Sequence, residues 1–417
     1  MMHPTCLSES VADLGGDLSR LESYLVACGY WNTPEKRQRH AYTLSPSAYV
    51  LTRAEHQELE HIAITTHAAV RVLNTRLCGL AKDAARLPNG DAAFLKLATA
   101  ASRGLLRPHD GVETIPEIIK LDLVRNACGG FRLVEADVYN PRGLGYAALL
   151  AESVPHPFRN RRFSGISALA TVLTSHSTAP WQILISEYER YYETAFRILS
   201  GSLESWGVRT HLLREEALAH GGDPLSTGST ETANLFAIPE SLFQRPLARD
   251  ALLARYRAGA LRTFYPPVAY LGSKAFLPFL RTCEGMEGII PRSGLVGKRF
   301  SLDALLADGN GAILKATVSS GMKGVFFSDL DRPAFDTALK KARAFKTPGF
   351  VLQEQIPQEP IPVVIFDEAG GRVTQDYYLR LTVYAMARGV LDAEVTGRPD
   401  RKVHGAPDCI QLPVIFS

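Results

Sequence analysis

The sequence lacks the features that direct a protein to a membrane, to secretion or to nucleic acid. It contains no run of ~18 apolar residues, the length that a membrane-spanning helix needs. Residues 1–10 show neither the basic start nor the apolar core of a signal peptide. A formal net charge of +3 over 417 residues is too small to indicate a nucleic-acid surface. We therefore expect a cytoplasmic protein with neither nucleic-acid nor membrane partners.

Cysteine is also scarce, which argues against a disulfide-stabilised or zinc-binding scaffold. No pair among the six cysteines has the short spacing of a zinc knuckle or of a redox motif. We therefore expect reduced thiols, as is usual in a cytosolic protein. The six residues are Cys6, Cys28, Cys78, Cys128, Cys283 and Cys409.

The composition is that of an ordinary globular protein, with 46% hydrophobic and 21% charged residues. The chain exceeds the size at which one hydrophobic core usually stops growing, so two or three subdomains are expected. Apolar residues recur at helical spacing up to residue 115, and the pattern then becomes mixed α/β. We expect an N-terminal helical region over residues 1–115, an α/β subdomain over 116–265 and a second mixed lobe over 266–417.

Strand patterns dominate the chain after residue 115. Two strands are expected over residues 116–124 and 130–140, joined by a turn that contains two glycines. A buried strand at 181–186, a helix over 187–207 and a strand at 209–213 form a βαβ-like unit, which favours an α/β layer. Further strands and one helix fill the last third. The strands are expected at 312–317, 323–328, 350–356, 361–367, 377–387 and 390–397, and the helix at 332–345.

Three acidic residues on the first two strands are the strongest chemical signal. Because side chains alternate along a strand, Lys120 and Asp122 share one face, and Glu135 and Asp137 share one face of the next strand. Three hard oxygen ligands on rigid strands suit Mg²⁺, which keeps several waters and shares phosphate oxygens. Solvated carboxylates at a sheet edge would show the same spacing, so both interpretations stand.

A second signal follows Lys315, which ends a predicted strand and precedes a loop of small residues. Backbone N–H groups in such a loop can hold a phosphate, and a lysine on the preceding strand can reach the same oxygens. The glycine spacing differs from that of a Walker A motif, and an ordinary hairpin is the alternative. The loop residues that could contact phosphate are Ser319, Ser320, Gly321, Lys323 and Gly324.

Four segments occur in an informative order. Residues 118–143 resemble a family segment in which Arg-x-Asp is followed by Glu-x-Asn. Residues 270–280 are similar to a Ser/Asn-Lys-Ala helix that begins a nucleotide lobe, and residues 313–325 to a second phosphate-binding lysine with its glycine-rich loop. Residues 385–398 resemble late strands that bring an arginine onto the phosphates.

The family in question is the ATP-grasp superfamily. The acidic segment precedes the lysines here, whereas it follows them in ordinary ATP-grasp proteins. Over roughly residues 116–417 the chain therefore resembles the circularly permuted members, in particular the synthetase domain of glutathionylspermidine synthase. The resemblance implies a mixed α/β ATP-grasp fold in permuted order, with residues 266–417 as the nucleotide-binding lobe.

The resemblance also implies a metal site and two departures from the family pattern. Asp122, Glu135 and Asp137 would hold one or two Mg²⁺ ions. The family arginine is Lys120 here, which loses the bidentate fork of a guanidinium. The family asparagine is Asp137, which adds negative charge.

The nucleotide contacts are implied in the same way. Lys274 and Lys315 would contact the phosphates of ATP, beneath the loop over residues 319–324. Arg398, with Arg380 as a second candidate, would stabilise the transferring phosphate. The adenine would be bordered by Gln353, Glu354 and the backbone of Gln355 and Ile356, although an ordinary strand end before Pro357 is the alternative.

The implied activity is an ADP-forming ligase that joins a carboxylate to an amine through an acyl phosphate. The partners would be small-molecule or peptide substrates, in a specialised peptide, natural-product or glutathionylspermidine-like biosynthesis. Another phosphotransferase on the same fold, or a nucleotide-binding protein without catalysis, would carry similar residues. Arg142 lies in a turn that could bind a substrate carboxylate or simply join a strand to a helix. No residue is assigned as the base that deprotonates the amine.

Overall fold

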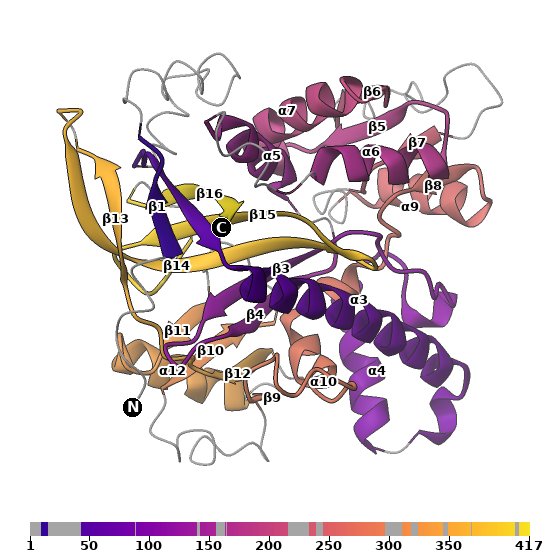
Figure 1. Ribbon diagram of the computed structural model, residues 1–417. Coiled ribbons are helices and arrows are strands. Elements are labelled where there is room, and N and C mark those ends of the chain that lie inside the picture. Colours follow the sequence, from indigo (N-terminus) through magenta and orange to yellow (C-terminus); the bar gives the residue numbers. More distant parts are fainter. Residues whose placement is uncertain are drawn as a thin grey trace.

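Three β-sheets organise the chain in the computed structural model (Figure 1). An eight-stranded sheet crosses the middle, a parallel sheet with its helices lies on one side of it, and a small antiparallel sheet lies on the other. The fold is mixed α/β, as expected. The structure describes residues 10–15, 43–87, 89–139, 142–155, 163, 165–215, 233–238, 245–296, 311–317, 324–344, 349–367, 369–404 and 408–417.

The central sheet joins both ends of the described chain to its middle. Its strand order is β1-β2-β16-β15-β14-β3-β4, and β13 pairs with β14 outside this path. All neighbours are antiparallel except β16 and β2, which are parallel. The strands are β1 (Val11–Asp13), β2 (Ser47–Leu51), β3 (Ile119–Arg125), β4 (Phe131–Asp137), β13 (Ile361–Phe366), β14 (Arg372–Met386), β15 (Gly389–Arg398) and β16 (Ile410–Phe416).

One face of the central sheet is apolar and is covered by the long helix α3 (Arg53–Lys82). Leu121, Val383 and Val395 are fully buried on this face. The helix begins with a capping box, in which Thr52 and Glu55 exchange side-chain and backbone hydrogen bonds. Helix α4 (Asn89–Ala101) packs beside α3 and extends the same core.

The region over residues 1–115, expected to be helical, contains two strands besides α3 and α4. Val11–Asp13 pairs with β2, and β2 pairs with β16 at the other end of the chain. The helical spacing of apolar residues did not predict these strands. Pairing with a distant strand can override a weak local preference for helix. Residues 16–42, where a helix was expected, lie outside the described part of the chain. The N-terminal third therefore completes the central sheet and covers its apolar face.

The second sheet is parallel and carries the expected βαβ unit. Its order is β6-β5-β7-β8, and every neighbouring pair is parallel. Helices lie against it, and α5 also contacts β15 and β16 of the central sheet. The strands are β5 (Trp181–Ile185), β6 (Thr210–Arg214), β7 (Ala233–Leu235) and β8 (Leu261–Thr263), and the helices are α5 (Leu144–Ser153), α6 (Gly165–His176), α7 (Glu193–Glu204) and α9 (Pro246–Arg257).

The third sheet is antiparallel, in the order β11-β10-β12-β9. Helix α12 (Arg332–Ala344) packs on one face, where Phe335 meets Leu314 and Leu352. Short helices, including α10 (Leu277–Leu280), connect this sheet to the rest. The strands are β9 (Ser293–Leu295), β10 (Ala312–Ala316), β11 (Val325–Phe327) and β12 (Phe350–Glu354). Among the described residues, no helix is long and apolar enough to cross a membrane.

The packing of α5 on α7 gives a testable stability difference. A Cβ added at Gly145 would lie 2.0 Å from the carbonyl oxygen of Ala195, whereas a Cβ at Gly201 would meet nothing within 4 Å. We expect Gly145→Ala to lower the free energy of unfolding by about 1–3 kcal/mol, since the backbones must separate. Gly201→Ala, within the same helix pair, should raise it by roughly 0.5–1 kcal/mol. Urea unfolding measures both, and equal effects would contradict the packing.

Candidate functional site

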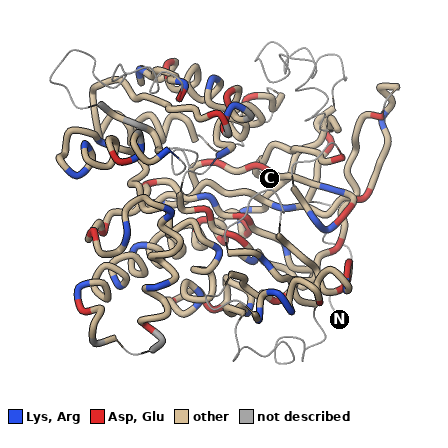
Figure 2. The backbone as a smooth tube through the Cα atoms, turned by 180° about the vertical axis from the view of Figure 1, so that it is seen from behind, with Lys and Arg blue, Asp and Glu red and all other residues tan. Residues whose placement is uncertain are grey.

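The face of the central sheet opposite α3 is polar. In-register pairing places Glu135, Asp122, Thr382 and Glu394 in one row across β4, β3, β14 and β15. Residues paired across neighbouring strands project from the same face, so this row forms one surface. Figure 2 shows acidic and basic segments intermingled at the centre of the molecule.

Asp122 is the buried centre of this row. The hydroxyl of Thr382 donates to its Oδ1 at 2.9 Å, Arg380 Nη1 lies 3.4 Å from its Oδ2, and Lys120 Nζ lies 3.7 Å from Oδ1. Burial alone would raise the pKa of the Asp122 carboxyl, but Arg380, Lys120 and the Thr382 hydrogen bond hold it below its ordinary value. Asp122 is therefore an anion at neutral pH.

Glu135 connects this face to the expected phosphate lysines. Lys274 Nζ lies 2.9 Å from Glu135 Oε1, although the two residues are far apart in sequence. Lys274 opens a short helix, and its backbone N–H donates to the carbonyl of Thr317 just beyond β10. The fold therefore brings one expected phosphate ligand directly onto one expected metal ligand.

Lys315 joins the third sheet to the central sheet. It projects from β10, and its Nζ donates to the carbonyl of Val134 at 2.8 Å and to Gln353 Oε1 at 2.7 Å. Burial lowers the pKa of its ammonium to about 8, with Glu135 opposing this shift and Lys274 adding to it. An anion at this place would raise this pKa again and so stabilise the protonated form.

A pocket lies between these two sheets. The space between its walls, including the open solvent at its mouth, is about 680 Å³. One wall carries charges and the other is largely apolar, as a nucleotide with a flat base and a charged tail requires. The lining residues are Asp122, Val124, Val134, Glu135, Ile313, Lys315, Val325, Phe327, Gln355, Ile356, Gln358, Arg380, Arg401 and Val403.

The expected convergence of three carboxylates on a metal ion is not what the structure shows. Within the described residues, no three His, Cys, Asp or Glu side chains gather as metal ligands. Lys120 is paired with Asp137 across the strands and contacts Asp122, so a cation separates the two carboxylates. Asp122 and Glu135 are direct cross-strand neighbours and both line the pocket. This pair fits a Mg²⁺ that is held by one or two carboxylates and shares phosphate oxygens, rather than a metal enclosed by protein.

The expected adenine border is only partly at the pocket. Gln355 and Ile356 line it. Gln353 is fully buried beneath it and accepts the hydrogen bond of Lys315. Glu354 points the other way and forms an ion pair with Arg292 at 3.2 Å. Strand alternation explains this split, because neighbouring residues of β12 face opposite sides of the sheet.

Of the two arginines expected at the phosphates, only Arg380 lines the pocket. Arg380 lines the pocket, whereas Arg398 makes a bidentate contact with Asp408 at 2.6 and 2.9 Å and donates to the carbonyl of Lys402. Arg401, which the sequence did not single out, lines the pocket and pairs with Asp329 at 2.8 Å. Arg398 thus anchors the segment that carries Arg401. The sequence around Arg398 and Arg401 does not show which of them lines the pocket. That depends on how the chain folds after β15.

The expected phosphate loop is described only at its end. Ser319, Ser320, Gly321 and Lys323 lie outside the described residues. Gly324 has a φ of +72°, and its carbonyl accepts a hydrogen bond from the backbone of Ala316, which closes the connection between β10 and β11. A positive φ of this kind favours glycine.

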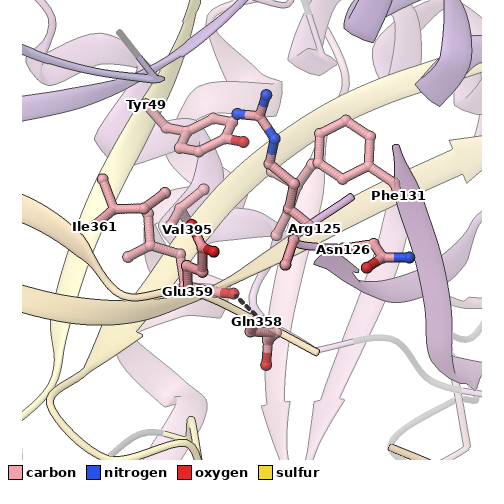
Figure 3. A pocket seen from close by; sticks show the side chains of 11 residues that line it. Tyr49, Arg125, Asn126, Phe131, Gln358, Glu359, Ile361 and Val395 are labelled. Carbon is pink, nitrogen blue, oxygen red and sulfur yellow. Dashed lines mark hydrogen bonds between the residues drawn. The ribbon is translucent and has the colours of Figure 1, made fainter. Parts of the chain in front are cut away.

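A second pocket, of about 420 Å³, lies on the apolar side of the central sheet (Figure 3). Arg125 projects into it between Tyr49 and Phe131. This arginine already lies 3.1 Å from Glu55 and donates to the hydroxyl of Ser10. Burial raises the pKa of Tyr49 to about 12, so its phenol stays neutral. The charged residues of its lining are Arg125 and Glu359, whereas the pocket beside Lys315 gathers two carboxylates and three cationic side chains and is the better candidate for chemistry.

Comparison with known proteins adds little to this geometry. No model of a known protein family matches the sequence, and no curated protein matches it. Among solved structures, a D-alanine–D-alanine ligase from Bacillus anthracis is similar over 52% of this chain and 86% of its own, with 11% identity and a TM-score of 0.28. A similarity at this level supports no inference, so the proposals below rest on the residues and their contacts.

The buried position of Lys315 gives a pH-dependent stability. Its folded pKa of about 8 lies below the roughly 10.4 of a lysine in an unfolded chain. The unfolded state therefore binds more protons between these values, and stability should rise with pH from about 8 upward, by at most about 3 kcal/mol. Urea unfolding of wild type and Lys315→Met from pH 7 to 9.5 measures the difference.

The matched control for this measurement is Lys340→Met, which removes an exposed lysine of α12. Lys340→Met should follow wild type across the pH range, whereas Lys315→Met should lose the rise. The burial of a titrating ammonium at Lys315 would be contradicted if the wild-type and Lys315→Met curves ran parallel.

Proposed function

We propose that this protein is an ATP-dependent ligase of the ATP-grasp type, with its chain in the circularly permuted order, that joins a carboxylate to an amine. One observation supports this most strongly. The pocket between the central and third sheets brings Lys315 together with Asp122, Glu135 and Arg380, and Lys274 contacts Glu135 at its edge. These residues come from four segments that are distant in the sequence, and the acidic segment precedes the lysines, as the resemblance implies.

The pocket suits Mg·ATP. The apolar wall formed by Ile313, Val325 and Phe327 offers the base a surface of carbon atoms. The phosphates would lie toward Lys315 and Lys274, whose positive charges are at present neutralised in part by Glu135. Asp122 and Glu135 would hold Mg²⁺, which neutralises phosphate charge when bound.

Each residue then has a role in phosphoryl transfer, which depends on positioning and on charge neutralisation. Lys274 and Lys315 would hold the phosphates. Arg380, fixed against Asp122 and the carbonyl of Val403, would face the transferring group. The substrate carboxylate would be phosphorylated to an acyl phosphate, and an amine would displace the phosphate to give an amide. The pocket walls would exclude water, which hydrolyses acyl phosphates.

Binding of Mg·ATP should stabilise the folded protein. At a nucleotide concentration one hundred times Kd, the free energy of unfolding should rise by about 2.7 kcal/mol. In Glu135→Gln the Mg-dependent part of this gain should be lost, because a neutral amide is a poor Mg²⁺ ligand. Thermal unfolding with ATP, with and without Mg²⁺, measures the gain.

Glu287→Gln is the control, since Glu287 is exposed and forms an ion pair with Arg281 at the surface. It should gain as much stability as wild type. If Glu135→Gln also gained the full Mg-dependent shift, the placement of Mg²⁺ at this pair would be wrong, and no shift in wild type would contradict the nucleotide pocket.

The reaction itself is tested with hydroxylamine, a small nucleophile that traps acyl phosphates as hydroxamates. Wild type is incubated with Mg·ATP and a panel of amino acids and short peptides as carboxylate donors. We expect ADP and hydroxamate to form in equal amounts, and only when a carboxylate donor is present. ADP formation that needs no carboxylate, or transfer to a hydroxyl group without hydroxamate, would instead indicate a phosphotransferase.

A further inference from the structure

The polar face of the central sheet meets the parallel sheet at Gly143. This residue precedes α5 with a φ of +103°, which favours glycine. A Cβ here would lie 2.5 Å from the Tyr384 hydroxyl and 3.3 Å from Glu394 Oε1. The turn before α5 therefore lies directly against two polar side chains of β14 and β15.

Glu394 is incompletely satisfied at this junction. It is only 7% exposed, and its Oε2 has no hydrogen-bond partner in the part of the chain that the structure describes. Its Oε1 lies 3.2 Å from the Tyr384 hydroxyl, which also lies 3.1 Å from the carbonyl of Arg142. One hydroxyl proton cannot serve both acceptors at once. A buried carboxylate with so few partners is costly, unless a ligand completes it.

The cationic side chains nearest to Glu394 form ion pairs with other carboxylates. Lys120 and Arg380 both contact Asp122, and Arg142 lies 2.9 Å from Glu189. Across the described residues Glu394 forms no ion pair, and burial raises the pKa of its carboxyl to about 7 although Lys120, Tyr384 and Arg380 oppose the shift. A group with such a pKa can gain and lose a proton near neutral pH.

The junction also adjoins an edge of the parallel sheet that is relevant to ligand binding. Glu189 follows β5 at the carboxyl edge of the parallel sheet, the edge at which parallel sheets usually bind ligands. Glu394 is two strands away from Asp122 in the same cross-strand row, a separation of roughly 10 Å. A substrate that spans this row would connect the nucleotide pocket to the junction.

We propose that Glu394 binds the protonated amine of the second substrate and accepts its proton. The substrate class is a primary ammonium on a small molecule or peptide, recognised by an unpaired buried carboxylate. The inference rests on the proposed ligase function, since it names the acceptor side of the same site.

The proton balance is complete without a further reagent. The ammonium gives one proton to the Glu394 carboxylate and becomes a neutral amine. The nitrogen lone pair attacks the acyl carbon, the C–N bond forms, and the C–O bond to phosphate breaks. The second nitrogen proton leaves with the phosphate, which departs as hydrogen phosphate. Glu394 then returns its proton to solvent.

The test compares two kinds of nucleophile in wild type and Glu394→Gln. Hydroxylamine is largely neutral at pH 7 and needs no base, so both proteins should form hydroxamate at similar rates. L-Alanine, glycinamide and 1,4-diaminobutane are protonated at this pH and need a base. Glu394→Gln should lower kcat/KM for these amines about 100-fold, within the usual range for a general base. If an amine does not react, its binding is measured by its inhibition of hydroxamate formation. This inhibition should be lost in Glu394→Gln.

Asp392→Asn is the matched control, because Asp392 lies two residues away on the same strand, is also buried, and packs against Gly165 at the start of α6. It should retain the amine reaction, and Glu394→Asp should retain part of it. Equal kcat/KM for amines in wild type and Glu394→Gln would overturn the proposal, as would amines that neither react nor compete. Absence of hydroxamate in wild type would overturn the ligase function, and this inference with it.

Discussion

The Lys315 ammonium is the contact on which the pocket depends. It reaches from the third sheet to a backbone carbonyl of β4, while Gln353 holds it from its own sheet. Together with the ion pair between Arg401 and Asp329, it links the charged face of the central sheet to the apolar face of the third sheet. Burying this cation costs free energy, as its lowered pKa shows. The same cost makes the site attractive to an anion, so one interaction accounts for both the architecture and the expected ligand.

The central sheet supplies the charged wall of the site, because polar and apolar side chains alternate along its strands. Polar and apolar residues alternate along the middle of β3, β14 and β15, with Asp122, Thr382 and Glu394 on the face opposite α3. Helix α3 therefore covers one face while the opposite face stays charged. This arrangement places Asp122 and Glu394 in one row, with Thr382 between them. A nucleotide at one end of the row and an amine at the other would then react across a rigid surface, which is how fixed geometry contributes to catalysis.

Much of this could be predicted from local sequence patterns. Alternation predicted the strands that carry Asp122 and Glu135, and the contact between Lys274 and Glu135 supports grouping their segments. Strand register, in contrast, is a property of the whole fold. Only the pairing shows that Lys120 neighbours both Asp122 and Asp137, so spacing alone could not show how the three carboxylates are arranged.

Other parts of the site depend on contacts between distant segments, which sequence patterns do not contain. Glu394 is notable only because Gly143 and Tyr384 pack on it from other segments. Arg401 faces the pocket because Arg398 is held by Asp408. Strand β2 was missed because its partner, β16, lies at the far end of the chain.

The most direct test of the account is a crystal structure with Mn²⁺ and a non-hydrolysable ATP analogue, in which anomalous scattering locates the metal. The account predicts the base against Ile313 and Phe327, the phosphates beside Lys315 and Lys274, and a Mn²⁺ peak between Asp122 and Glu135. A nucleotide bound elsewhere, or a metal peak away from these two carboxylates, would contradict it.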